Sequence, residues 1–381
     1  MEPEVKIQRR KTRQIFVGNV PVGGDAPISV QSMTNTETCD VDATVGQIRR
    51  LQDAGVDIVR VSVPSMDAAE AFGKIRQQVD VPLVADIHYD YKIALAVAER
   101  GVDCLRINPG NIGREDRIKA VIQCAKDKGL PIRIGVNAGS IAPENKERFG
   151  SDHIGAIAQC AIDHCEFLDD ADFYDYVVSI KDSDPRVVIE ANQRFAEARP
   201  DVPLHLGVTE AGMPPDGTIK TRIAFEQLLS RGIGDTIRVS LSAEPEQEVR
   251  VGYEILKSLG LRTRGVRVVS CPSCSRQGFD VIRTVEALEK RLEHIKTPMS
   301  LSVLGCVVNG PGEARETDIG ITGGGKGKHM VYLSGVTDHH VEDESMLDHI
   351  VRLVEEKAAR IEAGEDVAFD PHAAPAVEAA E

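Results

Sequence analysis

The chain has 381 residues, a length that favours one large domain followed by a smaller one. It carries 45 basic and 60 acidic residues, no tryptophan and 4% aromatic residues, which argues against a nucleic-acid-binding protein. No apolar run approaches the ~20 residues of a membrane helix, and the basic N-terminus is not followed by the apolar stretch of a secretory signal. We therefore expect a cytoplasmic protein without a membrane span, in which any basic site is local.

From residue 27, short apolar runs alternate with segments of helical periodicity such as 43–54 and 114–128. Eight of the apolar runs are predicted strands: 27–33, 57–63, 82–88, 104–109, 131–137, 176–182, 203–210 and 236–242. Eight strand–helix units with right-handed crossovers predict an α/β fold, a (β/α)8 TIM barrel over residues 10–260. A doubly wound open sheet is the alternative, but no GxGxxG motif follows the first strand.

Near residue 262 the pattern changes. We predict strands at TRGVRVVS, MSLSVLG, DIGITG and HMVYLSG, a helix over Phe279–Ile295, and a charged helix over about Glu342–Ala363. Together these elements predict a small α+β domain over residues 262–362. The end of the chain, 363–381, combines acids with Ala and Pro and has no Lys or Arg, which predicts an acidic disordered tail.

Barrel enzymes place their chemistry where strands end and loops begin. Five of the predicted strands each carry a cation that we expect near one mouth of the barrel: Arg60, Arg106, Arg133, Lys181 and Arg238. The acids expected beside them are Asp86, Asp182 and Glu210. The two surplus charges predict an anionic ligand that carries phosphate, unless single arginines form ion pairs at the edge of the core. Lys181 alone could instead form a Schiff base, and Asp86 with His88 an acid–base pair.

A cysteine cluster lies in the second half of the chain. Cys271-Pro-Ser-Cys274 and Cys306 each follow a predicted strand, and Glu313 comes after an Asn-Gly-Pro-Gly turn that can fold it back towards Cys306. Three thiolates without a fourth indicate an iron–sulfur cluster or zinc completed by another ligand, with a redox dithiol as a further alternative. The other five cysteines fit helix or strand interiors, so we expect them in the core.

A glycine-rich string, Gly320-Ile-Thr-Gly-Gly-Gly-Lys326, has the spacing of a phosphate-binding loop. Gly327 stands where that motif needs Ser or Thr, and the residues that follow alternate like a strand instead of opening a helix. We therefore predict a glycine-rich hairpin and no nucleotide site here.

Five strings carry a resemblance to a known family: QSMTNT (31–36), RINPGNIG (106–113), HLGVTEAG (205–212), CPSCSRQGFD (271–280) and CVVNGPGEA (306–314). In this order, over about residues 10–360, the chain resembles the short bacterial form of the 4-hydroxy-3-methylbut-2-enyl diphosphate synthases of the non-mevalonate isoprenoid pathway. The resemblance implies reductive ring opening and dehydroxylation of 2-C-methyl-D-erythritol 2,4-cyclodiphosphate to (E)-4-hydroxy-3-methylbut-2-enyl diphosphate. Two electrons would come from flavodoxin or ferredoxin.

The resemblance also implies a [4Fe–4S] cluster held by Cys271, Cys274, Cys306 and Glu313. It implies substrate contacts from Arg60, Asp86, His88, Arg106, Arg133, Asn137, Lys181, Arg238, Ser240 and Asn309. Glu210 is the expected proton donor, and Glu313 is a weaker ligand than thiolate that can leave its iron. A homodimer is implied, in which the barrel mouth of one chain faces the cluster domain of the other. The alternatives are a Schiff-base lyase using Lys181 with a structural zinc, and a non-catalytic iron or redox sensor.

Overall fold

The computed structural model describes residues 7–369 except 138, 140, 142 and 326. The chain divides into two compact units, Met1–Arg262 and Thr263–Glu381. The first unit contains an eight-stranded sheet, and the second contains a separate sheet of five strands. None of the described helices combines the length and the apolar character that a membrane crossing requires.

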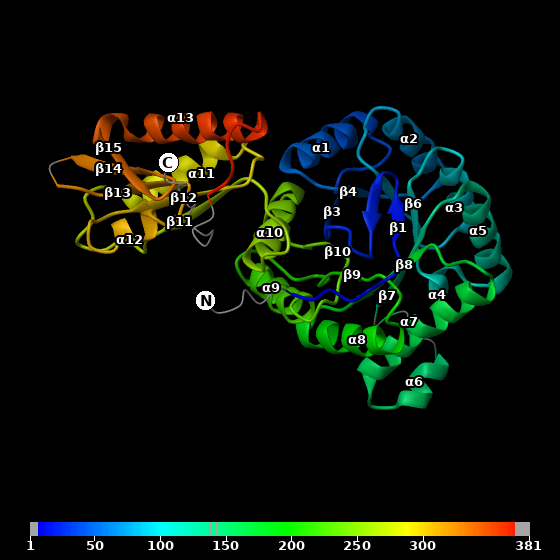
Figure 1. Ribbon diagram of the computed structural model, residues 1–381. Coiled ribbons are helices and arrows are strands. Elements are labelled where there is room, and N and C mark those ends of the chain that lie inside the picture. The colour runs from blue at the N-terminus through cyan, green and yellow to red at the C-terminus, as the bar shows by residue number, and fades with distance from the viewer. Residues whose placement is uncertain (1–6, 138, 140, 142, 326, 370–381) are drawn as a thin grey trace, which may run out of the picture. The chain divides into compact units, whose positions relative to one another are not determined.

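The first unit is a parallel β/α barrel, which confirms the predicted fold class (Figure 1). Its eight strands are β3 (Ser29–Met33), β4 (Ile58–Ser62), β5 (Leu83–Asp86), β6 (Cys104–Ile107), β7 (Ile132–Asn137), β8 (Tyr176–Lys181), β9 (His205–Leu206) and β10 (Thr236–Ile237). All neighbours pair in parallel, and β10 returns to pair with β3. A parallel bridge between Val178 and Leu204 joins β8 to β9 and closes the ring, so the open-sheet alternative is wrong.

Helices form the outer layer of the barrel (Figure 1). They are α1 (Val41–Ala54), α2 (Met66–Arg76), α3 (Tyr91–Ala98), α4 (Pro109–Ile112), α5 (Glu115–Lys128), α6 (Pro143–Phe149), α7 (His153–Asp170), α8 (Pro185–Ala198), α9 (Asp216–Leu229) and α10 (Pro245–Ser258). Helix α1 shows how local sequence sets the bounds. The Asp40 carboxylate accepts the N–H of Ala43 at the start, and Gly55 ends the helix with φ 95°.

A short hairpin that the sequence pattern did not predict covers the amino ends of the strands. It consists of β1 (Ile15–Val17) and β2 (Val20–Val22). Its apolar side chains form one cluster with Ile58, Val84, Cys104 and Val177, which stand near the starts of their strands. Three-residue strands carry too little periodicity to be read from sequence. The hairpin leaves the carboxyl ends of the strands as the end of the barrel where a ligand can enter.

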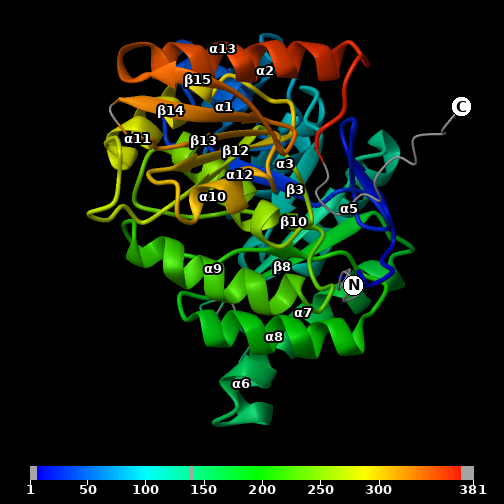
Figure 2. The ribbon, with the colours of Figure 1, turned by 60° about the vertical axis from the view of Figure 1, so that its left-hand side comes forward.

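The second unit is a five-stranded sheet with helices on both faces (Figure 2). Its elements are β11 (Val266–Ser270), α11 (Val281–Leu292), β12 (Met299–Leu304), α12 (Gly310–Ala314), β13 (Ile319–Thr322), β14 (Lys328–Leu333), β15 (Val336–Glu342) and α13 (Asp343–Glu362). Helices α11 and α13 share a core with Leu301, Ile319 and Ile321. Because β13 is antiparallel to β14, the segment between them is a hairpin, as the glycine-rich string predicted.

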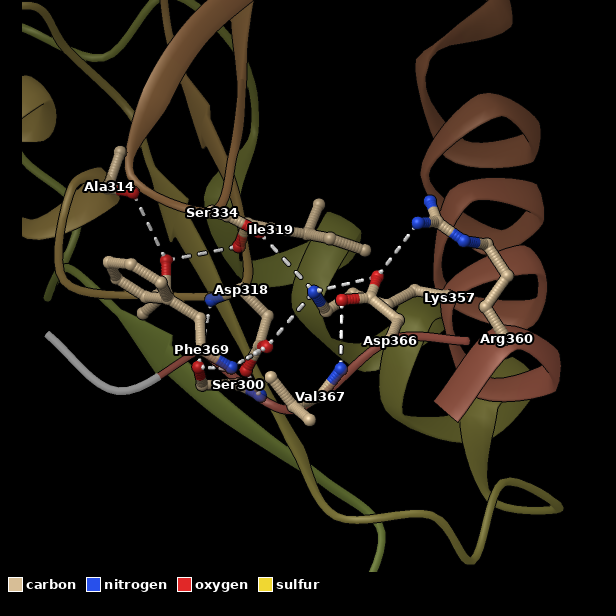
Figure 3. Close-up of polar contacts among 11 residues, drawn as sticks. Ser300, Ala314, Asp318, Ile319, Ser334, Lys357, Arg360, Asp366, Val367 and Phe369 are labelled. Carbon is tan, nitrogen blue, oxygen red and sulfur yellow. Dashed lines mark hydrogen bonds and ion pairs between the residues drawn. The ribbon is translucent and has the colours of Figure 1, made fainter. Parts of the chain in front are cut away.

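A buried carboxylate, Asp318, organises one edge of this unit (Figure 3). Asp318 is 2% exposed, and its Oδ2 accepts both the backbone N–H and the hydroxyl of Ser300 at 2.7 Å. The ammonium of Lys357, on α13, lies 3.4 Å from Asp318 Oδ1 and donates to the hydroxyl of Ser334 at 3.3 Å. A buried charge of this kind is stable only when it is paired and hydrogen-bonded, and here both conditions hold.

The residues after α13 join the same network (Figure 3). The backbone N–H of Phe369 donates to Asp318, and Asp366 lies 3.6 Å from the Lys357 ammonium. Within residues 363–369, Asp366 and Phe369 thus bind polar groups of the folded domain. Composition could not show this, since it does not reveal which buried groups need a partner. Residues 370–381 of the predicted tail lie outside the described residues.

Three of the five cysteines that were expected in the core are buried, namely Cys104, Cys160 and Cys165. Cys124 is half-buried. Cys39 is exposed in the loop that precedes α1, so the prediction was wrong for this residue. All eight cysteines lie in the described part of the chain, and none of them forms a disulfide.

Candidate active site

The five predicted cations lie on, or directly after, parallel strands of the barrel, whose carboxyl ends share one edge. Arg60 is on β4, Arg106 and Arg133 are register partners on β6 and β7, Lys181 ends β8, and Arg238 follows β10. Arg60, Arg133 and Lys181 are each less than 10% exposed. Burial and the neighbouring cations lower the pKa of Arg60, Lys181 and Arg238, and lower that of Arg133 to about 10. The structure thus concentrates positive charge where the sequence predicted it.

Asp86 is the carboxylate inside this cluster. Its Oδ1 accepts Arg106 Nη1 at 2.9 Å, and its Oδ2 lies 3.6 Å from Arg60 Nε and 3.7 Å from His88 Nε2. Burial alone would raise the pKa of Asp86, but Arg60 and Arg106 outweigh that effect and lower it to about 2. Asp86 is therefore ionised at neutral pH and orients the cations around it.

Two glycines, one in β7 and one directly after β9, make room for the long cationic side chains. A Cβ at Gly207 would lie 2.9 Å from Cε and 3.0 Å from Nζ of Lys181. A Cβ at Gly135, on β7, would collide with the guanidinium of Arg106. Glycine inside a strand marks such close approaches. These two residues belong to the site although sequence reasoning did not single them out.

Several buried polar atoms of the barrel have no hydrogen-bond partner among the described residues. On and after the strands they include Gln31 Nε2, Thr34 Oγ1, Arg133 Nε and Nη2, His205 Nε2, Arg238 Nε and Ser240 Oγ; Ser29 Oγ and Asn192 Oδ1 are further examples in the barrel. Most of these atoms are donors, and Arg133 uses only Nη1, at 2.5 Å from Gln31 Oε1. An unpartnered buried donor costs about 1–3 kcal/mol. The pattern indicates a ligand rich in acceptor oxygens and negative charge.

The other predicted site residues of the barrel are placed differently. Asp182 accepts the backbone N–H of Asp184 at 2.9 Å in the loop before α8. Glu210 is exposed, with φ 53°, after β9. Asn137, at the end of β7, is also exposed and stands in register with Lys181. The expected acidic partners Asp182 and Glu210 form no ion pair with the five cations in the described part of the chain.

The second carboxylate that opposes the cations is Glu248 on α10, which the sequence reasoning missed. Burial lowers the pKa of Arg238, and the negative charge of Glu248 offsets part of that lowering. A signal was present in the sequence. Pro245, Val249 and Gly252 are buried at helical spacing around Glu248, so this acid lies on the apolar face of its helix.

The alternative role for Lys181 is that of a Schiff-base nucleophile. Its pKa is lowered by burial first and then by the four arginines of the cluster, with Arg238 and Arg60 the strongest. An anion bound among these cations would counter the lowering of the Lys181 pKa that the arginines cause. The lowered pKa is therefore a property of the cation cluster and does not identify Lys181 as a nucleophile.

The three cysteines of the second unit lie at the carboxyl ends of two neighbouring parallel strands. Cys271 follows β11 and Cys306 follows β12, and the N–H of Gly305 donates to Cys271 Sγ at 3.3 Å. The backbone N–H and the guanidinium of Arg276 lower the pKa of Cys274. All three thiols are at least partly exposed. The lowered pKa of Cys274 favours its thiolate, the form of a cysteine that binds metal.

Glycines bring the loops of this region together. The N–H of Gly278 donates to the carbonyl of Gly305 at 2.6 Å, and the N–H of Gly323 donates to that of Leu304 at 2.7 Å. A Cβ at Gly278 would lie 2.6 Å from the carbonyl oxygen of Gly324. The glycine-rich string that imitates a phosphate loop therefore serves as packing for the cysteine loops.

Glu313 lies on α12, the helix that follows Cys306. The predicted turn is a helical one, in which the carbonyl of Cys306 accepts the N–H of Gly310 at 3.2 Å and that of Asn309 accepts the N–H of Glu313. Glu313 is exposed. Three thiols on loops and one carboxylate on the helix after Cys306 are the donor types that an iron–sulfur cluster with one exchangeable corner requires.

Among the described residues, no three His, Cys, Asp or Glu side chains lie close enough to hold one metal ion.

The fold and the cation cluster define a β/α-barrel enzyme that binds a phosphorylated ligand. Residues 12–253 match the model of the GcpE TIM-barrel domain, and residues 267–356 match that of the GcpE protein C-terminal domain. The chain belongs to the GcpE family, the 4-hydroxy-3-methylbut-2-en-1-yl diphosphate synthases, and is an oxidoreductase of isoprenoid biosynthesis. The family resemblance and the enzyme class predicted from the sequence are confirmed, and the sensor alternative is wrong.

Curated relatives support this assignment over nearly the whole chain. The 4-hydroxy-3-methylbut-2-en-1-yl diphosphate synthase (flavodoxin) of Alcanivorax borkumensis is 65% identical over 360 residues, which cover 94% of this chain and 96% of the relative. The enzyme of the same name from Zymomonas mobilis is 60% identical, covering 95% and 96%. That of Chromohalobacter salexigens is 58% identical, covering 96% and 98%.

Proposed function

We propose that the chain converts 2-C-methyl-D-erythritol 2,4-cyclodiphosphate into (E)-4-hydroxy-3-methylbut-2-enyl diphosphate by reductive ring opening and dehydroxylation. The observation that carries the proposal is the group of buried cations with unpartnered donors in one barrel mouth. The test is an anaerobic turnover assay with the cyclic diphosphate and a chemical reductant. Formation of the linear diphosphate supports the proposal, and no conversion by iron-loaded protein refutes it.

The barrel residues bind and orient the diphosphate. Guanidinium groups match phosphate oxygens in bidentate geometry, and a desolvated site makes each contact stronger. The proposed contacts are Arg60, Arg106, Arg133, Asn137, Lys181, Arg238 and Ser240, with Asp86 and His88 holding the cations in place. Fixing both phosphates aligns the ring carbon that loses its oxygen with the leaving group.

Glu210 is the proposed proton donor for the oxygen that leaves as water. Asp86 cannot fill this role at neutral pH, because its pKa of about 2 keeps it ionised. Glu210 is exposed at the strand end and forms no ion pair within the described residues, so its carboxyl is accessible to a ligand. Replacing Glu210 by Gln should lower kcat with little change in KM, whereas a change in KM alone would contradict a proton-donor role.

In this proposal Cys271, Cys274, Cys306 and Glu313 hold a [4Fe–4S] cluster, and Asn309 contributes to the site beside it. When bound, such a cluster supplies the substrate with electrons that arrive one at a time. Anaerobically purified protein should contain about four iron and four sulfide per chain. One tightly bound zinc and no sulfide would refute this part of the proposal.

Flavodoxin is the proposed electron donor, because the names of the relatives specify it. The free thiols fit the reducing cytoplasm as the proposed compartment.

We also propose a homodimer in which the barrel of one subunit works with the small domain of the other. Mixing Arg133→Ala chains with Cys306→Ala chains tests this arrangement. Recovery of activity supports it, and two inactive chains that stay inactive when mixed refute it.

A further inference from the structure

Glu248 is a buried carboxylate to which the proposed chemistry assigns no role. It lies in the first turn of α10 and is 5% exposed. Its Oε2 accepts the hydroxyl of Ser32 at 3.0 Å, and its Oε1 accepts the backbone N–H of Leu241 at 2.9 Å. One side chain thus bonds to two segments that are about 200 residues apart in the chain.

These two segments flank the candidate substrate site. Ser32 follows Gln31, the residue that accepts the guanidinium of Arg133. Leu241 follows Ser240 and stands three residues after Arg238. A change in the position of Glu248 would therefore reach proposed phosphate contacts on both sides of the site.

The backbone alone does not hold the second segment against β3. The ladder between β10 and β3 consists of the pairs Thr236–Ser29 and Ile237–Val30 and ends there. Beyond it, the N–H of Arg238 donates to the carbonyl of Leu206 on β9. Glu248 therefore provides the link to β3 that the ladder no longer provides over residues 238–241.

The same segment carries groups that have no partner among the described residues. They are Arg238 Nε and Ser240 Oγ, both buried. Their positions relative to a ligand depend on the backbone of residues 238–241, because each side chain extends from it. A segment that moves would lose the geometry of both contacts together.

We propose that Glu248 is a positioning residue for the diphosphate of the substrate. Through its two hydrogen bonds it fixes residues 238–241 so that Arg238 and Ser240 contact phosphate oxygens. The inference rests on the proposed function, since it requires an anionic substrate in the barrel mouth. A change at Glu248 should therefore weaken substrate binding and leave kcat nearly unchanged, because Glu248 acts before any bond of the substrate is broken.

The experiment compares three variants of the full-length protein with the unaltered chain. Isothermal titration measures the Kd for inorganic pyrophosphate, and steady-state assays with the cyclic diphosphate give KM and kcat. Glu248→Ala should raise both Kd and KM about tenfold, equivalent to about 1.4 kcal/mol, with kcat within about twofold. Glu248→Gln keeps an acceptor for Leu241 and a group that bonds Ser32, so both constants should return to within about threefold of the unaltered chain.

Glu244→Ala is the matched control. Glu244 is exposed at the start of the same helix and makes no capping hydrogen bond, so this variant loses one negative charge without losing a contact. It should behave as the unaltered chain. If Glu248→Ala does not fold, Ser32→Ala removes one of the two bonds and should raise Kd about threefold.

Three outcomes overturn the inference. A lower melting temperature of Glu248→Ala with unchanged Kd and KM shows a structural role only. A Glu248→Gln variant as impaired as Glu248→Ala shows that charge, not hydrogen bonding, is what matters. If the unaltered chain neither binds pyrophosphate nor converts the cyclic diphosphate, the proposed function fails, and this result is distinct from the first two.

Discussion

Helix α12, which carries Glu313, rests on a glycine of the sheet. A Cβ at Gly320, in β13, would lie 2.7 Å from Cβ and 2.9 Å from Cα of Ala314, and 2.8 Å from Oγ of Ser302. Ala314 is fully buried and cannot turn away. We predict that Gly320→Ala displaces α12 and with it the carboxylate of Glu313.

The size of the effect follows from these distances. Carbon atoms in contact stand about 3.5–4.0 Å apart, so α12 must move by about 1 Å to admit the new methyl group. Overpacking of this kind costs about 1–3 kcal/mol of unfolding free energy. A group misplaced by about 1 Å lowers activity by as much as 100-fold. We therefore expect a moderate loss of stability and a larger relative loss of turnover.

Gly312→Ala is the control for this prediction. Gly312 precedes Glu313 in the same helix, and a Cβ there would meet no atom within 4 Å. Urea unfolding is followed by circular dichroism, because the chain has no tryptophan, and turnover is measured on iron-loaded protein. Gly312→Ala should match the unaltered chain in both assays. Equal unfolding midpoints and equal turnover of the two variants would refute the packing argument.

Three further predictions concern the site itself. Arg133→Ala should raise KM by tenfold or more with a smaller change in kcat, because it removes buried donors from the diphosphate; an unchanged KM in steady-state assays would contradict this. Glu313→Ala should abolish most turnover yet shift the unfolding free energy by no more than about 0.5 kcal/mol, since Glu313 is exposed. Urea unfolding curves and turnover assays on the same preparation test this prediction. Asp86→Asn should destabilise the protein by a constant amount from pH 7 to 5. The pKa of Asp86 is about 2 in the folded protein and about 3.9 in the unfolded chain. The stabilising effect of the Asp86 carboxylate is therefore lost as the pH falls between these two values. The difference in urea midpoint between the unaltered chain and Asp86→Asn should accordingly narrow below about pH 4.

The strand ends of the barrel could be predicted because two rules act together. Short apolar runs separated by helical segments give parallel strands, and parallel strands bring their carboxyl ends to one edge. Arg106 and Arg133 come from different runs, yet the register pairs them directly. The cation cluster followed from that reasoning. Of its acidic partners, Asp86 followed in the same way. Glu248 did not, because a strand-end rule cannot find an acid that reaches the site from a helix.

Other elements were missed because their signal lies outside hydrophobic periodicity. Strand β15 has mostly exposed polar residues, Val336 to Glu342, as an edge strand that avoids aggregation does. The hairpin of β1 and β2 has three residues per strand, too few for a pattern. The contact of Phe369 with Asp318 joins positions 51 residues apart and depends on a buried carboxylate that only the folded sheet creates.

The balance of charge in the barrel mouth links stability to substrate choice. Five cations face two opposing carboxylates, Asp86 and Glu248, so three positive charges remain in a chain whose formal net charge is −15. Such a surplus opposes folding, because burial and mutual repulsion both disfavour the charged forms. A bound anion offsets part of this surplus, and two linked phosphates offer more acceptor oxygens to the unpartnered donors than a single phosphate does. A neutral sugar would leave the surplus charge unpaired, so the site favours a phosphorylated ligand over a neutral one.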